Sequence, residues 1–120
     1  MKARILFAED DLALQQVVAE QLREEGYAVT AVDNGMEALK RVEHARFELA
    51  LLDIRMPGKD GMEVLQEIRA HAPLTRVVML TGVDEFSVAM EAMRLGANDY
   101  ITKPFSLREL LSCIGRALER

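Results

Sequence analysis

Three acidic residues directly follow apolar runs in this chain, where they could hold a metal ion. Glu9 and Asp10 come after the apolar residues 5–8, and Asp53 comes after residues 49–52. If these runs are neighbouring strands, three carboxylates meet at one spot and repel one another unless a hard cation neutralises them. Oxygen ligands with room for water suit Mg²⁺ or Mn²⁺. The spacing therefore indicates a site for a divalent cation.

A hydroxyl and a lysine each follow a further stretch that is predicted to be a strand. Thr81 comes after residues 76–80, and Lys103 follows residues 98–102. Lys103 offers a point charge to one phosphate oxygen, and Thr81 offers a hydroxyl to another. An aspartate beside a metal ion and a lysine is equipped to attack a phosphoryl group, because the cations offset the charge of the group in transfer. We therefore expect Asp53 to be the reacting carboxylate.

Runs of strand and helix alternate along the chain and must position these residues. Short apolar runs bounded by Gly, Pro, Asn and Asp read as strands, and apolar residues at helical spacing read as helices. The predicted strands are residues 4–8, 27–32, 49–53, 76–82 and 98–104, and helices are predicted at 12–22, 36–45, 62–68, 86–95 and 107–118.

Polar residues mark where three of the helices begin. Asp60 is placed to cap the third helix and Asp84 to open the fourth. Ser106 precedes the last helix with Glu109 at the capping-box position. The single cysteine, Cys113, has no partner for an internal disulfide and is expected to be a buried thiol.

The alternation predicts an α/β fold with a five-stranded parallel sheet and helices on both faces. Connections between parallel strands are right-handed crossovers, and these place the connecting helices on the two faces of the sheet. We expect the flavodoxin-like strand order 2-1-3-4-5, which makes the first and third strands neighbours. Under that order Glu9, Asp10 and Asp53 converge at the carboxyl edge of the sheet, where ligands of such folds bind.

Length and composition limit the class of protein. With 120 residues, 50% of them hydrophobic, residues 1–120 read as one domain with a single core. The net charge of −5 argues against binding to nucleic acid. The first apolar run is too short for a signal peptide or a membrane span, so we expect a cytoplasmic protein without membrane contact.

Four motifs together resemble the receiver domain of two-component response regulators, over essentially the whole chain. They are the pair Glu9-Asp10 after a strand, LLDIRMPGKDG around Asp53, LTG at Thr81 and DYITKPF around Lys103. Each motif is weak alone, but four in this order, each at a strand end, are highly specific.

The resemblance implies roles for the acidic residues and the lysine. Asp53 would accept a phosphoryl group from the phosphohistidine of a sensor histidine kinase. Asp10 and Glu9 would hold Mg²⁺ together with Asp53 and the backbone carbonyl of Arg55, and Lys103 would bind the acyl phosphate. The chain would assist its own phosphorylation and dephosphorylation without being an enzyme that turns over an external metabolite.

The resemblance also implies a switch. Thr81 and Tyr100 would change position on phosphorylation and remodel the face formed by the fourth helix, fifth strand and fifth helix, which is a population shift between two packings. That face would control an output domain or effector protein, most often in transcription regulation, or a second copy of the chain. Lys103-Pro104 resembles the cis-peptide site of the family.

Three residues depart from the commonest family pattern. Glu9 replaces an aspartate, and its extra methylene favours contact with the metal through a water. Arg55 lies two positions after Asp53, and Val83 lies two positions after Thr81. The Arg55 guanidinium could shield the phosphoryl group, and Val83 offers no group to orient an attacking water, so we expect a persistent phosphoryl group.

Other classes fit the sequence less well. A haloacid-dehalogenase-like phosphatase needs a second carboxylate two residues after its aspartate, where this chain has Arg55. A flavodoxin-like cofactor binder needs a phosphate loop after the first strand, where Glu9 and Asp10 would repel phosphate. The serious alternative is a pseudo-receiver that binds proteins without being phosphorylated.

The sequence leaves two points open, one at the end of the last helix and one on the fourth helix. Residues 116–120 end the last helix without a cap, which favours a domain cut from a longer protein over a stand-alone receiver. Phe86, Met90 and Met93 fall on one side of the fourth helix, either as core residues or as an exposed surface for a partner.

Overall fold

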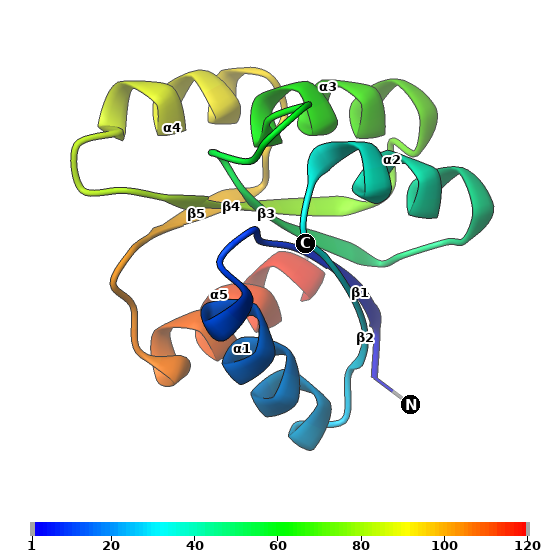
Figure 1. Ribbon diagram of the computed structural model, residues 1–120, viewed down its shortest axis with the longest axis vertical. Coiled ribbons are helices and arrows are strands. Elements are labelled where there is room, and N and C mark those ends of the chain that lie inside the picture. Colours follow the sequence, from blue (N-terminus) through cyan, green and yellow to red (C-terminus); the bar gives the residue numbers. More distant parts are fainter. Residues whose placement is uncertain (1, 120) are drawn as a thin grey trace.

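A computed structural model, described here for residues 2–119, confirms the predicted α/β fold. Five strands form one parallel sheet in the order β2-β1-β3-β4-β5, and the helices alternate with them along the chain (Figure 1). The strands are β1 Arg4–Ala8, β2 Ala28–Val32, β3 Leu49–Asp53, β4 Arg76–Thr81 and β5 Asp99–Thr102. The helices are α1 Leu12–Glu24, α2 Gly35–His44, α3 Gly61–His71, α4 Phe86–Arg94 and α5 Leu107–Glu119.

Helices cover both faces of the sheet. Helices α1 and α5 pack on one face, and α2, α3 and α4 pack on the other (Figure 1). Because both faces are covered, the central strands carry apolar side chains at successive positions, and every residue of β3 is buried. The buried thiol of Cys113 lies on the α5 face, as predicted.

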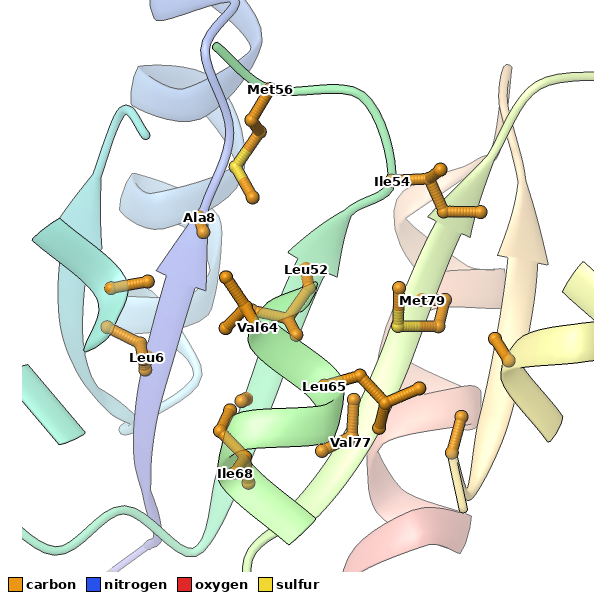
Figure 2. Close-up of a cluster of buried hydrophobic side chains, with 14 of the residues drawn as sticks. Leu6, Ala8, Leu52, Ile54, Met56, Val64, Leu65, Ile68, Val77 and Met79 are labelled. Carbon is orange, nitrogen blue, oxygen red and sulfur yellow. The ribbon is translucent and has the colours of Figure 1, made fainter. Parts of the chain in front are cut away.

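The core on the α3 face leads directly to the edge where the acidic residues lie. Figure 2 shows Leu52 of β3 and Val64 of α3 among these side chains, with Ile54 and Met56 at the end of the strand. Burying a Leu or Val side chain contributes about 2 kcal/mol. The loop after Asp53 is therefore attached to the core by the buried side chains of Ile54 and Met56, which restricts the conformation of this loop.

Side-chain caps start the helices largely as the sequence indicates. Asp60 and Glu63 exchange hydrogen bonds with each other's backbone N–H at the start of α3, and Ser106 and Glu109 do the same before α5. Asp84 does not open α4, contrary to expectation. The residue before α4 is Glu85, whose carboxylate turns back toward the preceding loop.

The remaining differences concern the ends of elements. β2 begins one residue later than predicted, β5 ends at Thr102, and α4 ends at Arg94. Arg120, part of the predicted uncapped end of the last helix, lies outside the described residues. Within residues 2–119, no helix is both long enough and apolar enough to cross a membrane.

Candidate functional site

The structure brings the three predicted acids together at the carboxyl edge of the sheet. One carboxylate oxygen from each of Glu9, Asp10 and Asp53 lies within 4.8 Å of the others. Their proximity follows from the pairing of β1 with β3, in which Ala8 lies opposite Leu52. Glu9 and Asp53 are buried, whereas Asp10 is exposed. The cluster therefore opens to solvent on the side of Asp10.

Lys103 contacts two of these acids, which was not predicted from the sequence. Its Nζ is 2.8 Å from Oε1 of Glu9 and 3.2 Å from Oδ2 of Asp53. The backbone N–H of Lys103 donates to the carbonyl of Thr81 at 2.7 Å, which ties the end of β5 to the end of β4. The Lys103–Pro104 peptide bond is cis, as the resemblance implies.

Burial and pairing shift the pKa values of this buried pair. Burial raises the pKa of Glu9 to about 7, although the Lys103 ammonium and the Asp11 N–H both act to lower it. Burial alone would lower the pKa of Lys103, but its hydrogen bond to Glu9 and the charges of Asp53 and Glu9 outweigh burial and raise it. The lysine is therefore fully charged at neutral pH.

The donor set fits a hard divalent cation. Oxygen atoms of three carboxylates meet here, and Lys103 contributes one positive charge to them. Negative charge therefore remains for a metal ion to neutralise. Oε1 of Glu9 faces Lys103, and Oε2 accepts from the Asp11 N–H at 3.1 Å. Both Glu9 oxygens thus have protein partners, which leaves Asp10 and Asp53 as the residues best placed to bind a cation directly.

The loop after β3 is held against the site by the close approach of Gly61. A Cβ at Gly61 would lie 2.3 Å from the carbonyl oxygen of Asp53, so only glycine fits there without a shift of backbone. The Gly61 N–H donates to the Ile54 carbonyl at 2.8 Å. These contacts hold the start of α3 against the backbone of Asp53 and Ile54.

The two predicted switch residues lie on the neighbouring strands. Thr81 is buried at the end of β4, and its Oγ1 is 3.4 Å from Oγ1 of Thr102 on β5. Tyr100 is half-buried on β5 and packs against the core cluster that includes Met79 and Ala92. The switch pair is therefore carried by β4 and β5, the two strands of the sheet that follow β3 in space.

Sequence reasoning missed Glu85. It is 6% exposed, its Oε1 accepts from the Gly82 N–H at 2.6 Å, and its Oε2 accepts from the Arg55 guanidinium. The Arg55 side chain is thus paired with a buried carboxylate. Two adjacent acids precede the fourth helix, and only the position of the preceding loop determines which one turns inward.

The side of α4 that the sequence left open is exposed. Phe86, Met90 and Met93 are 63%, 37% and 36% exposed, respectively. Val83, in the loop before α4, is also largely exposed. These residues form an apolar surface on α4 and in the loop before it, and they are not core residues.

Comparisons with known proteins agree on one family. Residues 5–115 match the family described as response regulator receiver domain. The chain is 40% identical over 119 residues to the uncharacterized transcriptional regulatory protein YkoG of Bacillus subtilis, covering 99% of this chain and 52% of that protein. It is 39% identical to the response regulator protein FleR of Pseudomonas aeruginosa, covering 97% of this chain and 24% of that protein. The chain thus spans about half or less of the length of these relatives.

Solved structures show the same fold. A putative response regulator from Chloroflexus aurantiacus superposes with a TM-score of 0.93 at 29% identity, with all of both chains covered. NtrX from Brucella abortus superposes with a TM-score of 0.93 at 35% identity, covering 99% of this chain and 27% of that one.

Proposed function

The chain belongs to the response regulator receiver domain family, and we propose that residues 1–120 form a receiver whose Asp53 accepts a phosphoryl group from a sensor histidine kinase. The observation that carries the proposal is the convergence of Glu9, Asp10, Asp53 and Lys103 at one strand edge. A carboxylate between a cation site and an ammonium group is suited to phosphoryl transfer.

In the proposed step, an Oδ of Asp53 attacks the phosphorus of a phosphohistidine. A P–O bond forms as the P–N bond breaks, and the imidazole leaves as the neutral base after taking up a proton. Lys103 exchanges its contact with Asp53 Oδ2 for the transferred oxygens, and the Thr81 hydroxyl donates to another of them. The chain assists its own modification in this way and turns over no metabolite.

Mg²⁺, or Mn²⁺, is the proposed cofactor. Asp10 and Asp53 would bind it directly with the backbone carbonyl of Arg55, and Glu9 would contact it through a water. When bound, the cation offsets the negative charge that develops on the transferring phosphoryl group. Asp10, the exposed acid, provides the route of entry from solvent.

Phosphorylation would act on the α4–β5–α5 face through Thr81 and Tyr100. Movement of Thr81 toward the phosphoryl group removes its contact with Thr102 and leaves space for the Tyr100 ring to turn inward. The apolar surface lies on α4, the helix that packs on the same face of the sheet as Tyr100. We infer that the face controls an output domain or effector in the cytoplasm, or a second copy, and that the output is transcription regulation, since the relatives include transcriptional regulators.

Intact-mass measurement after incubation with a small phosphodonor tests the proposal. The expected result is one phosphoryl adduct on the native chain in Mg²⁺, and none with chelator or in Asp53→Asn. Asp84→Asn, which removes an exposed acid outside the cation cluster, serves as the matched control and retains the adduct. A folded native chain without an adduct would instead favour the pseudo-receiver, a protein-binding module that is not phosphorylated.

A further inference from the structure

Glu85 connects the loop after β3 to the loop after β4 through a buried carboxylate. Its Oε1 accepts from the Gly82 N–H at 2.6 Å, and its Oε2 accepts from Arg55 Nε. The Glu85 side chain is 8% exposed, whereas that of Arg55 is 78% exposed. The arginine therefore reaches this carboxylate from the outer side of the loop, and each carboxylate oxygen has its own donor.

Both donors belong to the edge where Asp53 lies. Arg55 follows Asp53 by two residues, and Gly82 directly follows Thr81. β3 and β4 are neighbours, with Asp53 opposite Leu80. A hollow of about 650 Å³ beside the acidic cluster is lined by Asp10, Arg55 and Glu85 among others. The ion pair thus lines a hollow that Asp10, one of the three clustered acids, also lines.

Glu85 occupies the capping position of α4 without capping it. Asp11, Asn34 and Asp60 each accept from a backbone N–H of the helix that follows them. Glu85 makes no such bond to α4 within the described chain. Its charge is instead removed from water, which costs free energy unless charged or strongly polar donors compensate. Here the two compensating donors are Gly82 N–H and Arg55.

A phosphoryl group on Asp53 would be a second strong acceptor at the same edge. Its oxygens carry more negative charge than a carboxylate and form charge-assisted hydrogen bonds with guanidinium and amide donors. The two anions compete for the donors and repel each other. The single Gly82 N–H can serve only one of them at full strength, and the Arg55 guanidinium, which contacts Glu85 through Nε, is drawn toward both.

We propose that Glu85 is a positioning residue that occupies, in the unphosphorylated chain, the Gly82 N–H and Arg55 guanidinium that a phosphoryl group on Asp53 would take. This inference rests on the proposed phosphorylation of Asp53. Displacement of the carboxylate frees the segment that leads into α4, so phosphoryl occupancy and the position of α4 are coupled through this one side chain. Glu85 thereby determines how strongly the conformation of the unphosphorylated chain opposes phosphorylation of Asp53.

Beryllofluoride with Mg²⁺ is the probe, because it adds to an acceptor carboxylate as a phosphoryl analogue without a kinase. Glu85→Gln keeps the size of the side chain and removes its charge. We expect the apparent dissociation constant of beryllofluoride to fall about tenfold in this variant, since neutral acceptors hold these donors less strongly. The matched control is Glu91→Gln, which removes an acid of α4 that pairs with Arg94 away from the site, and its constant should stay within about twofold of the native value.

A second measurement uses the native chain alone and does not depend on the folding of a variant. The amide signal of Gly82 and the Nε–H signal of Arg55 should both shift in the NMR spectrum on saturation with beryllofluoride. The Nε–H signal of Arg94, paired with Glu91, should stay in place.

The outcomes separate the two claims. Equal or weaker binding of beryllofluoride by Glu85→Gln, or unchanged Gly82 and Arg55 signals in a saturated native chain, overturns the role of Glu85 and leaves the receiver function standing. Failure of the native chain to bind beryllofluoride at all overturns the proposed function and this inference with it.

Discussion

Lys103 Nζ lies 2.8 Å from Oε1 of Glu9, a residue that the fold shields completely from solvent. The two residues follow β5 and β1, which are separated by β3 and β4 in the sheet. The ion pair therefore connects the ends of two strands that are not neighbours in the sheet. The same ammonium group also contacts Asp53, which lies at the end of β3.

Replacing Lys103 with methionine should destabilise the fold. The change leaves the buried Glu9 carboxylate without its cation, and we expect a loss of about 2 kcal/mol in the free energy of unfolding, measured by chemical denaturation. Adding Glu9→Gln should recover much of that loss. The control is Lys59→Met, because Lys59 pairs with Glu67 at 3.8 Å on the surface and its loss should cost at most about 0.5 kcal/mol. Equal costs for the two lysines would contradict the buried pairing.

Replacing Asp10 with asparagine should uncouple stability from Mg²⁺. The melting temperature of the metal-free protein should rise, because fewer carboxylates then repel one another. For the native chain, Mg²⁺ at about ten times its dissociation constant should add about 1.4 kcal/mol, and this gain should be absent from the variant. Glu20→Gln, an exposed acid on α1, should keep the native response. A response to Mg²⁺ that survives in Asp10→Asn would place the cation elsewhere.

Replacing Gly61 with alanine should cost stability because its Cβ would lie 2.3 Å from the Asp53 carbonyl. We expect a loss of about 2 kcal/mol in the free energy of unfolding. Gly115 provides the matched control, since a Cβ there meets nothing within 4 Å and alanine favours the interior of α5 by about 0.5 to 1 kcal/mol. Thermal or chemical denaturation of both variants should therefore give changes of opposite sign, and two changes of the same sign would refute the close approach at Gly61.

The phosphoryl group on Asp53 should last for minutes or longer in Mg²⁺. The exposed Val83 offers no polar atom to orient an attacking water, and Arg55, once released from Glu85, would cover the phosphoryl group. Val83→Gln supplies an amide at that position and should shorten the lifetime, which intact mass followed over time would record. A native lifetime of seconds or less would show that neither residue protects the group.

Much of the fold was predictable because the controlling signals are local. The apolar run at residues 49–52 and the capping residues Asp60 and Ser106 act over a few residues, and the handedness of the crossovers leaves few arrangements of the sheet. The convergence of Glu9, Asp10 and Asp53 follows once strand order is known, because the ends of parallel strands share one edge.

The interactions that the sequence did not reveal depend on distant contacts. Asp84 and Glu85 are both acidic and adjacent, and burial of Glu85 depends on Gly82 and Arg55, which only the folded chain brings to it. Likewise, the exposure of Phe86 depends on how α4 is rotated against the sheet, which its spacing alone does not determine.

Reductive trapping of the phosphorylated chain identifies the residue that carries the phosphoryl group. Borohydride converts an aspartyl phosphate to homoserine, so mass-spectrometric sequencing of the digested protein locates the acceptor. We expect homoserine at position 53 alone, formed only when Mg²⁺ was present during phosphorylation. Reduction at Asp10 or Glu9, or a phosphoryl group on another kind of residue, would contradict it.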